Sequence, residues 1–221
     1  MTPKILALDC ETSHLRADFG TLLCWGYKWV GEKRISVPSL LDFPGKSPID
    51  DRALLKEAHR VMSGADAYLT YYGKGFDLPF LQAKFLEYGM PMLPPVPHID
   101  IYFTVKSNLS LSRKSLANVS EFLNLKAKKT PVAGRIWKRA MVGDRGAMRY
   151  IVSHCRADIA LLEEAYYRLR PLIRLHPRLG PDGCRTCGGH VIRDKIRYSA
   201  AGVMKVQYVC TKCGSYETRS K

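Results

Sequence analysis

The amino-acid sequence predicts an α/β fold in which a mixed sheet is flanked by helices, followed by a small cysteine-rich unit. Ile5–Leu8 is a wholly apolar run, which fits a strand buried on both faces. Strand-like and helix-like patterns then alternate as far as Leu169. Beyond a stretch rich in proline and glycine (residues 171–183) come two Cys-x2-Cys pairs.

The first half of the chain predicts three strands, a helix, a further strand and a second helix. Residues 21–30 are rich in aromatic and apolar side chains, and residues 34–37 can return as another short strand, which together predict an antiparallel meander. Asp50 or Asp51 can cap a helix that Gly64 ends. Residues 67–72 form the next strand, and a helix that starts near Asp77 stops at Gly89.

The second half predicts a short strand at residues 98–103, with Asp100 inside it, and a helix over residues 115–123. A basic loop at residues 126–139 follows. Asp144 can cap a long helix that Pro171 terminates.

Two carboxylates stand at the end of the first strand. Asp9 and Glu11 are two residues apart, so on a strand they point to the same side, whereas Cys10 faces the core. Carboxylates this close repel each other unless a cation lies between them, and oxygen ligands suit Mg²⁺ or Mn²⁺. The alternative is that both acids are merely solvated at the end of a strand.

Other acids occur at comparable places. Asp77 follows the strand at 67–72 and begins a helix, where helix capping is its alternative role. Tyr150, His154 and Asp158 are spaced four apart and form one stripe on the long helix. A histidine and an aspartate are therefore presented together, although His154 could also be a core or surface residue with no role.

Composition and charge narrow the class of protein. With 221 residues and 46% hydrophobic content, the chain suits one full domain and a small appendage, with no membrane span. No secretory signal is evident, so we expect a cytoplasmic protein. The net charge of +15 is concentrated in two blocks: residues 104–149 hold 11 basic and 2 acidic residues, and residues 171–221 hold 10 and 3. Such blocks beside a carboxylate cluster favour a polyanionic partner, with a solubilising surface as the alternative.

The motifs resemble those of a known family. Asp9-Cys10-Glu11-Thr12, Phe76-Asp77-Leu78-Pro79-Phe80-Leu81 and His154-Cys155-Arg156-Ala157-Asp158 follow the order and approximate spacing of the three motifs of the DEDD exonuclease superfamily. The segment from Asp100 to Leu125 is similar to the branch near the family-B polymerase proofreading domain. The resemblance covers residues 1 to about 170 and implies a ribonuclease H-like fold.

Two positions depart from the family pattern. The family has Asn five residues before the second-motif Asp, where this chain has Tyr72, so contacts to the substrate backbone would differ. The family offers Tyr four residues, or His five residues, before the last Asp, and this chain has His154 at the Tyr spacing. That offset rotates the side chain by about 100° around the helix.

The resemblance implies 3'-5' exonuclease chemistry with two Mg²⁺ or Mn²⁺ ions. Asp9, Glu11 and Asp158 would bind one ion, Asp9 and Asp77 the other, and His154 would act as general base. The expected nucleic-acid contacts are Thr12, Tyr72, Lys74, Phe76, Lys114, Lys128 and Lys129. For each lysine, simple solvation at the surface is the alternative. Tyr72 and Tyr102 could stack on terminal bases, with core packing as the alternative use of each.

The C-terminal cysteines predict a metal-binding unit. Cys184, Cys187, Cys210 and Cys213 form two Cys-x2-Cys pairs separated by 22 residues, each followed by glycine. Four thiolates at this spacing suit one structural Zn²⁺, and the unit resembles a zinc ribbon. Two disulfides are the alternative, which would require an oxidising compartment. Residues 190–196 and 203–209 predict a hairpin between the pairs.

We therefore expect an exonuclease domain at residues 1–175 and a zinc ribbon at residues 181–221. The expected activity is metal-dependent hydrolysis at the 3' end of DNA or RNA. The basic ribbon would grip nucleic acid, with docking to a protein as the alternative. Two other functions remain open at this point: a non-catalytic nucleic-acid-binding module, and a structure-selective endonuclease on the same fold. The sequence does not distinguish DNA from RNA, nor does it indicate an oligomeric state.

Overall fold

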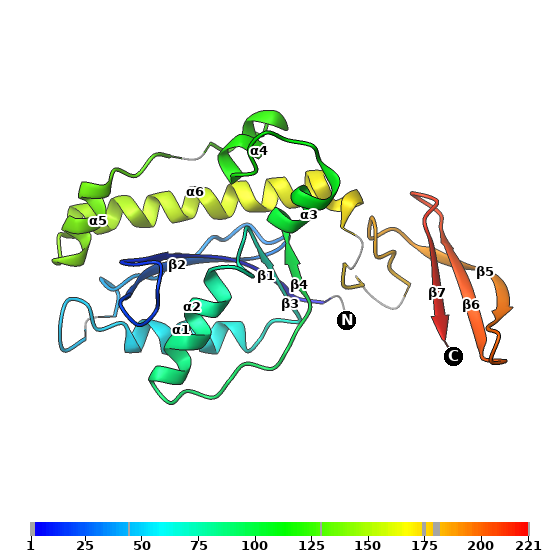
Figure 1. Ribbon diagram of the computed structural model, residues 1–221, viewed down its shortest axis with the longest axis horizontal. Coiled ribbons are helices and arrows are strands. Elements are labelled where there is room, and N and C mark those ends of the chain that lie inside the picture. The colour runs from blue at the N-terminus through cyan, green and yellow to red at the C-terminus, as the bar shows by residue number, and fades with distance from the viewer. Residues whose placement is uncertain (1–2, 44, 129, 174–175, 179–181, 221) are drawn as a thin grey trace. The chain divides into compact units, whose positions relative to one another are not determined.

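The computed structural model describes residues 3–43, 45–128, 130–173, 176–178 and 182–220. The chain divides into two compact units, one from Lys4 to Leu169 and a second that begins at Arg170 (Figure 1). The expected domain limits, 1–175 and 181–221, fall on residues outside the described ranges and stay predictions.

The first unit contains a four-stranded mixed sheet with the strand order β2-β1-β3-β4. Its strands are β1 (Ile5–Thr12), β2 (Leu22–Trp29), β3 (Ala67–Thr70) and β4 (His98–Asp100). The strand β2 is antiparallel to β1, whereas β3 and β4 continue the sheet in parallel. The expected mixed α/β fold is confirmed, with the carboxylate-bearing β1 in the interior of the sheet.

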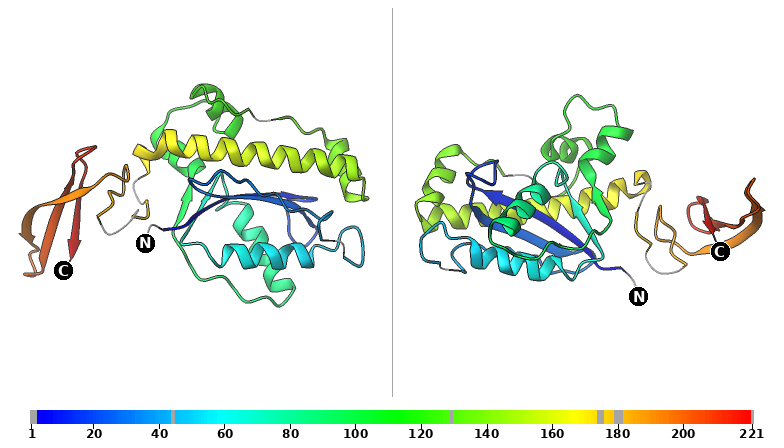
Figure 2. Two further views of the ribbon diagram at one scale, coloured as in Figure 1. Left: turned by 180° about the vertical axis from the view of Figure 1, so that it is seen from behind. Right: turned by 60° about the horizontal axis from the view of Figure 1, so that its bottom comes forward.

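Helices cover both faces of this sheet (Figures 1 and 2). One face carries α1 (Arg52–Met62) and α2 (Asp77–Glu87). The other is crossed by the 25-residue helix α6 (Arg145–Leu169), which packs on β1 and β2. Three shorter helices contact α6, namely α3 (Ile101–Asn108), α4 (Leu116–Phe122) and α5 (Gly134–Met141).

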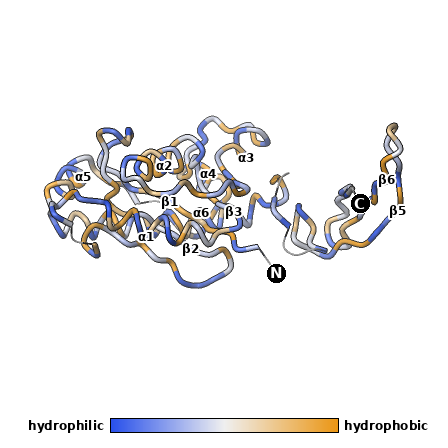
Figure 3. Tube along the Cα trace, turned by 90° about the horizontal axis from the view of Figure 1, so that it is seen from below, coloured by the Kyte–Doolittle hydropathy of each residue, from blue (hydrophilic) through white to orange (hydrophobic). Residues whose placement is uncertain are grey.

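The core lies between these layers. The core includes fully buried side chains from both layers: Leu6 and Leu8 on β1, and Ile151 and Cys155 on α6. Figure 3, coloured by hydropathy, shows hydrophobic residues on both the central strands and α6. The apolar run that predicted β1 therefore supplies side chains to the core between the sheet and α6.

Several local expectations were wrong. Residues 34–37 form no strand. Ser36 makes an isolated bridge to Tyr27 of β2, and Ser39, beyond the expected strand, makes another to Cys24. Ile101 begins a helix instead of extending a strand, because the Asp100 carboxylate accepts a hydrogen bond from the Tyr102 amide and caps α3. Residues 134–139 of the expected basic loop are helical, as part of α5.

The capping predictions had mixed outcomes. Asp144 caps α6 as expected, because its Oδ1 accepts from the Ala147 amide at 2.8 Å. Asp51 stands at the cap position of α1 but makes no side-chain cap bond, since its buried carboxylate accepts from the Leu22 amide instead.

The second unit begins with a short 3₁₀ turn, η1 (Arg170–Leu172), and contains a three-stranded antiparallel sheet. The predicted hairpin is present as β5 (Val191–Tyr198) and β6 (Met204–Cys210). A third strand that the sequence did not predict, β7 (Tyr216–Ser220), pairs with β6. Among the described residues, no helix has the length and apolar character needed to cross a membrane.

Candidate active site

All five residues predicted to be catalytic line one cavity of about 550 Å³. Asp9 and Glu11 reach it from β1, Asp77 from the start of α2, and His154 and Asp158 from the middle of α6. A second cavity of about 510 Å³ shares Asp9 and Asp158 with the first and extends toward Tyr102 and Lys114. The carboxylates therefore stand where two adjoining hollows meet.

Gly26 allows α6 to approach the sheet at this point. It pairs with Asp9 in the register of β1 and β2. A Cβ atom at position 26 would lie 2.7 Å from Ile159 Cγ1 and 2.8 Å from Cys155 Sγ. Only a residue without a side chain fits there, so Gly26 sets how closely α6 brings Asp158 to Asp9. Sequence reasoning missed this residue.

His154 faces the carboxylates with one ring nitrogen and a threonine with the other. Its Nε2 lies 3.7 Å from Glu11 Oε1 and 3.7 Å from Asp158 Oδ2. Its Nδ1 lies 2.8 Å from Thr130 Oγ1. Although the histidine stands four residues before Asp158, its ring points into the carboxylate cluster. Thr130 was not predicted, because nothing near it in the sequence marks a partner for His154.

Tyr150 belongs to the same stripe on α6 as His154 and Asp158, but its hydroxyl bonds to the segment that precedes α5. Its hydroxyl donates to the carbonyl of Pro131 at 2.8 Å. Glu164 accepts from the amides of Lys126 and Ala127 at 2.9 and 3.1 Å. Together these two residues of α6 hold both ends of the segment that presents Thr130 to His154.

Asp77 is oriented by the backbone of β1. Its Oδ1 accepts a hydrogen bond from the Cys10 amide at 2.8 Å, and the residue preceding it, Phe76, occupies the cap position of α2. The alternative that Asp77 is a helix cap is therefore wrong. Burial, with a smaller contribution from the nearby charge of Asp100, raises the pKa of Asp77 to about 7, against the Cys10 hydrogen bond, which lowers it.

The donor atoms fit hard divalent cations. Ligand atoms of Glu11, His154 and Asp158 all lie within 4.8 Å of one another, and so do those of Asp9, Glu11 and Cys155. Asp77 is in neither of these groups of described residues, although it lines the same cavity. Carboxylate oxygens dominate the set, and Mg²⁺ and Mn²⁺ prefer such ligands. The raised pKa of buried Asp77 is a further sign that this cluster suits a compensating positive charge.

The predicted nucleic-acid contacts are not all brought to the cavities. Tyr72, Phe76 and Lys114 line them, whereas Thr12, Lys74 and Lys128 do not. Lys129 lies outside the described residues. Arg16, on the loop after β1, lines the larger cavity and was not predicted.

Asp100 orders the loop between β3 and α2. Its Oδ1 accepts from the amides of Tyr72 and Tyr102 at 2.9 and 3.0 Å, and its Oδ2 accepts from the Lys74 amide at 2.9 Å. The side chain is 5% exposed. The Asp100 carboxylate thus holds the backbone beside the site through hydrogen bonds and is not part of the carboxylate cluster.

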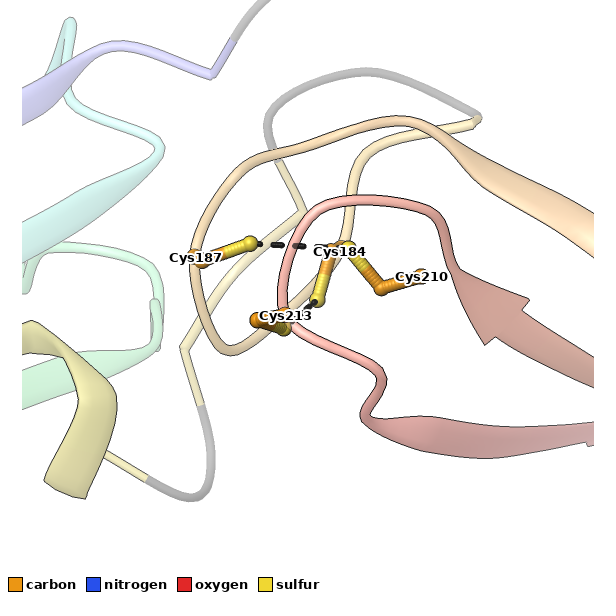
Figure 4. Close-up of side chains that lie close together, drawn as sticks. All are labelled: Cys184, Cys187, Cys210 and Cys213. Carbon is orange, nitrogen blue, oxygen red and sulfur yellow. Dashed lines mark hydrogen bonds between the residues drawn. The ribbon is translucent and has the colours of Figure 1, made fainter.

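The four C-terminal cysteines form a separate cluster in the second unit (Figure 4). Their sulfur atoms all lie within 4.8 Å of one another, with 3.7 Å between Cys184 and Cys213 and 3.5 Å between Cys187 and Cys210. Tetrahedral zinc with Zn–S bonds of about 2.3 Å places its sulfurs about 3.8 Å apart. All seven cysteines are free, so the alternative of two disulfides is wrong for this structure.

Backbone amides surround this cluster. The amides of Thr186, Gly189 and Lys212 donate to Cys184, Cys187 and Cys210 at 3.3 to 3.4 Å. Burial opposes ionisation of Cys184, but hydrogen bonds from Ser215 and the backbone lower its pKa to about 6. Burial and hydrogen bonds with the neighbouring cysteines instead raise the pKa of Cys187 to about 12. The spacing of the four sulfurs and the donated amides fit a zinc ribbon.

Comparison with known proteins places the first unit in a family. A family model described as the RNase_H superfamily matches residues 6–170. No curated protein matches the chain.

Two solved structures resemble the chain. The family B DNA polymerase from the hyperthermophilic archaeon Pyrobaculum calidifontis is 16% identical with a TM-score of 0.58, over 90% of this chain and 31% of the polymerase. A structure described as the apo form of the nuclease is 17% identical with a TM-score of 0.48, over 75% of this chain and 73% of that chain. The likeness to the polymerase concerns the fold alone, and this chain spans about a third of that protein.

Proposed function

The chain belongs to the RNase H superfamily, and from that premise we propose that it is a metal-dependent 3'-5' exonuclease acting on DNA or RNA. One observation carries the proposal: Asp9, Glu11, Asp77, Asp158 and His154 converge on a single cavity from three different elements. A surface that only bound nucleic acid would gain nothing from four anionic groups facing phosphates. A hydrolase that binds catalytic cations needs such carboxylates as ligands.

Asp9, Glu11, Asp77 and Asp158 would hold two Mg²⁺ or Mn²⁺ ions. Bound there, these ions would neutralise the phosphodiester and supply a nucleophile at neutral pH. The chain's own part is to keep the four carboxylates converged before substrate arrives. The Cys10 amide orients Asp77, and Gly26 lets α6 bring Asp158 close to β1.

His154 would accept the proton of the attacking water. A hydroxyl at Nδ1 and carboxylates near Nε2 hold the ring with Nε2 toward the cavity. If Nδ1 carries the proton and donates it to Thr130, Nε2 keeps the lone pair that a general base requires. Thr130 is then a positioning residue for His154.

The cysteine cluster would bind one structural Zn²⁺, and its sheet would add affinity for nucleic acid. Arg197 on β5 faces Lys205 on β6, and Lys195 faces Gln207, so three basic side chains share one face of the sheet. This face supports a contact with phosphates. Docking to a protein is the alternative outcome for the ribbon.

The activity test is digestion of end-labelled oligonucleotides with Mg²⁺ or Mn²⁺. We expect a ladder of products shortened from the 3' end, with release of nucleoside 5'-monophosphates. Asp9→Ala, Asp77→Ala and Asp158→Ala should abolish cleavage while binding is retained or tightened, since anionic repulsion falls. Discrete internal cuts would indicate an endonuclease, and binding without products would indicate a recognition module. Wild-type turnover in any two of these variants would refute the site.

His154 is tested separately. His154→Ala should lower the rate about 100-fold, the scale of general-base catalysis. Thr130→Val, which keeps the shape of the side chain but removes the hydroxyl, should lower kcat more than it raises KM, and Thr130→Ser should recover most of the loss. An equal loss in the valine and serine variants would rule out a positioning role for the hydroxyl.

A further inference from the structure

The strands β5, β6 and β7 form one antiparallel sheet in the second unit (Figure 1), and its two faces carry different side chains. Residues directly opposite each other on such strands share a face, and the faces alternate along each strand. We call one of them the basic face. Its rows, starting next to Cys210, are Ile192 with Val209 and Tyr216, then Lys195 with Gln207 and Thr218, then Arg197 with Lys205. This face combines one apolar row with two rows that carry cations.

On the opposite face, charges and aromatic surface are already engaged. Arg219 Nε donates to Glu217 Oε1 at 2.6 Å, and Arg178 lies 3.4 Å from the same oxygen. The guanidinium carbon of Arg219 lies 4.1 Å from the centroid of the Tyr208 ring and covers it. The arginines there share a carboxylate, so that face offers little to an incoming anion.

The basic face keeps its charge. Arg197 Nε donates to Gln207 Oε1 at 2.7 Å, which orients the guanidinium with a neutral partner. Lys205 is directly opposite Arg197, and like charges at such positions destabilise a sheet. An anion bound over this pair would remove the repulsion. The one acid beside these cations is Asp194, 3.7 Å from Lys195, and an ion pair this exposed is weak.

The apolar row of the basic face is open to solvent. Tyr216 is 61% and Ile192 47% exposed, on either side of Val209. Because two residues along a strand span about 7 Å, this row lies about 7 Å from the row of Lys195 and about 14 Å from that of Lys205. An exposed ring thus lies within the reach of one chain of phosphates that follows the cations.

We propose that the basic face binds an unpaired stretch of nucleic acid, with a base stacked on Tyr216 and the phosphates on Lys195, Arg197 and Lys205. The inference rests on the proposed function for the choice of nucleic acid over another polyanion. Stacking on an aromatic ring tolerates any base, because every base has a π-face. Bases inside a duplex are stacked on both sides, so a duplex can use the cations but not Tyr216. The ribbon therefore prefers single strands and requires no 3' end.

Four substitutions separate stacking from charge. Tyr216→Thr removes the ring and leaves a good strand former, whereas Tyr216→Phe keeps the ring. Tyr198→Thr is the matched control, because Tyr198 is 69% exposed on the opposite face of the sheet. Arg197→Gln removes one cation from the basic face, and Arg193→Gln removes one from the opposite face of the same strand. Each variant should retain one zinc, measured with a chromogenic chelator, which shows that its second unit is folded.

The assay is fluorescence anisotropy of the full chain with labelled closed circles of single-stranded DNA, single-stranded RNA and duplex DNA, at several salt concentrations and without added Mg²⁺ or Mn²⁺. Tyr216→Thr should weaken single-strand binding by about 5- to 150-fold, the effect of removing one base–aromatic stack, with the salt slope and duplex affinity unchanged. Arg197→Gln should lower the slope of log affinity against log salt by about 0.7. Tyr216→Phe, Tyr198→Thr and Arg193→Gln should show the affinity for single strands or the salt slope of the wild type.

A closed circle has no 3' end, so binding of an end at the carboxylates does not contribute. Single-strand binding that depends on Tyr216 and Arg197 would uphold the proposal even if the protein proved to have no nuclease activity. Equal affinity of Tyr216→Thr and Tyr198→Thr for both single-stranded circles, or equal salt slopes in Arg197→Gln and Arg193→Gln, would overturn it.

Discussion

Gly26→Ala is expected to impair catalysis by separating two elements that are far apart in the sequence. The new methyl group would lie 2.7 Å from Ile159 Cγ1 and 2.8 Å from Cys155 Sγ. Carbon atoms in contact stay about 3.5 Å apart at the closest, so α6 or β2 must move by about 0.8 Å. Because Gly26 is opposite Asp9, that movement occurs beside the carboxylates.

The magnitude follows from this displacement. Overpacking a core by one methyl group costs about 1–3 kcal/mol. For a unit of this size, each kcal/mol lowers the melting temperature by about 2–4 °C, which gives a fall of about 2–12 °C. A misplacement of about 1 Å in a catalytic arrangement costs about 100-fold in rate. A 100-fold loss corresponds to about 2.7 kcal/mol in the activation barrier. The turnover of the folded variant should therefore fall about 100-fold.

The measurement is turnover of a 3' end-labelled substrate at a temperature well below the melting transition of the variant, so that unfolding does not contribute. Gly134→Ala is the matched control, because a Cβ at that helical position meets nothing within 4 Å. It should leave the rate unchanged and, if anything, add stability. Wild-type turnover in fully folded Gly26→Ala would refute the claim that this glycine sets the distance between Asp9 and Asp158.

Three further outcomes are expected. Cys184→Ser combined with Cys213→Ser should release one zinc, detected with a chromogenic chelator, and unfold only the second unit; retention of stoichiometric zinc would contradict the four-sulfur site. A fragment of residues 1–172 lacks ten basic and three acidic residues of the full chain, so its nucleic-acid affinity should fall less steeply with salt; an unchanged slope would make the ribbon a protein-docking element. Burial lowers the pKa of His98 to about 4, whereas the unfolded chain takes up that proton below about pH 6.5, so the free energy of unfolding in urea should fall as the pH drops from 6.5 to 4. His98→Gln should flatten this dependence.

Local periodicity accounts for the parts of the site that the sequence predicted. A strand places residues i and i+2 on one side, which grouped Asp9 with Glu11. A helix places residues i and i+4 on one side, which grouped His154 with Asp158. Because β1 is an interior strand of the sheet and α6 packs on it, these two local pairs meet, and the cavity contains both.

The residues that the sequence did not reveal act over long separations. Gly26 must lack a side chain because Cys155 and Ile159 of α6 pack against it. Thr130 bonds to a histidine 24 positions later in the chain. Asp100 was assigned to a strand, because a run of apolar residues gives no indication that its carboxylate would cap a helix and bind the loop after β3. The third strand of the second unit was missed because Tyr216–Ser220 is short and polar, and its strand conformation depends on pairing with β6.

The hydrogen bond that orients Asp77 comes from a main-chain amide, and this affects how the site tolerates sequence change. Any residue except proline at position 10 supplies the same N–H group, whereas the Cys10 thiol, which also hydrogen-bonds to the Asp77 carboxyl and lowers its pKa, depends on the side chain. The Cys10 side chain is 5% exposed and belongs to the hydrophobic core. A small apolar residue at position 10 would therefore lose the thiol contact with Asp77 but keep the main-chain donor, which belongs to the strand itself.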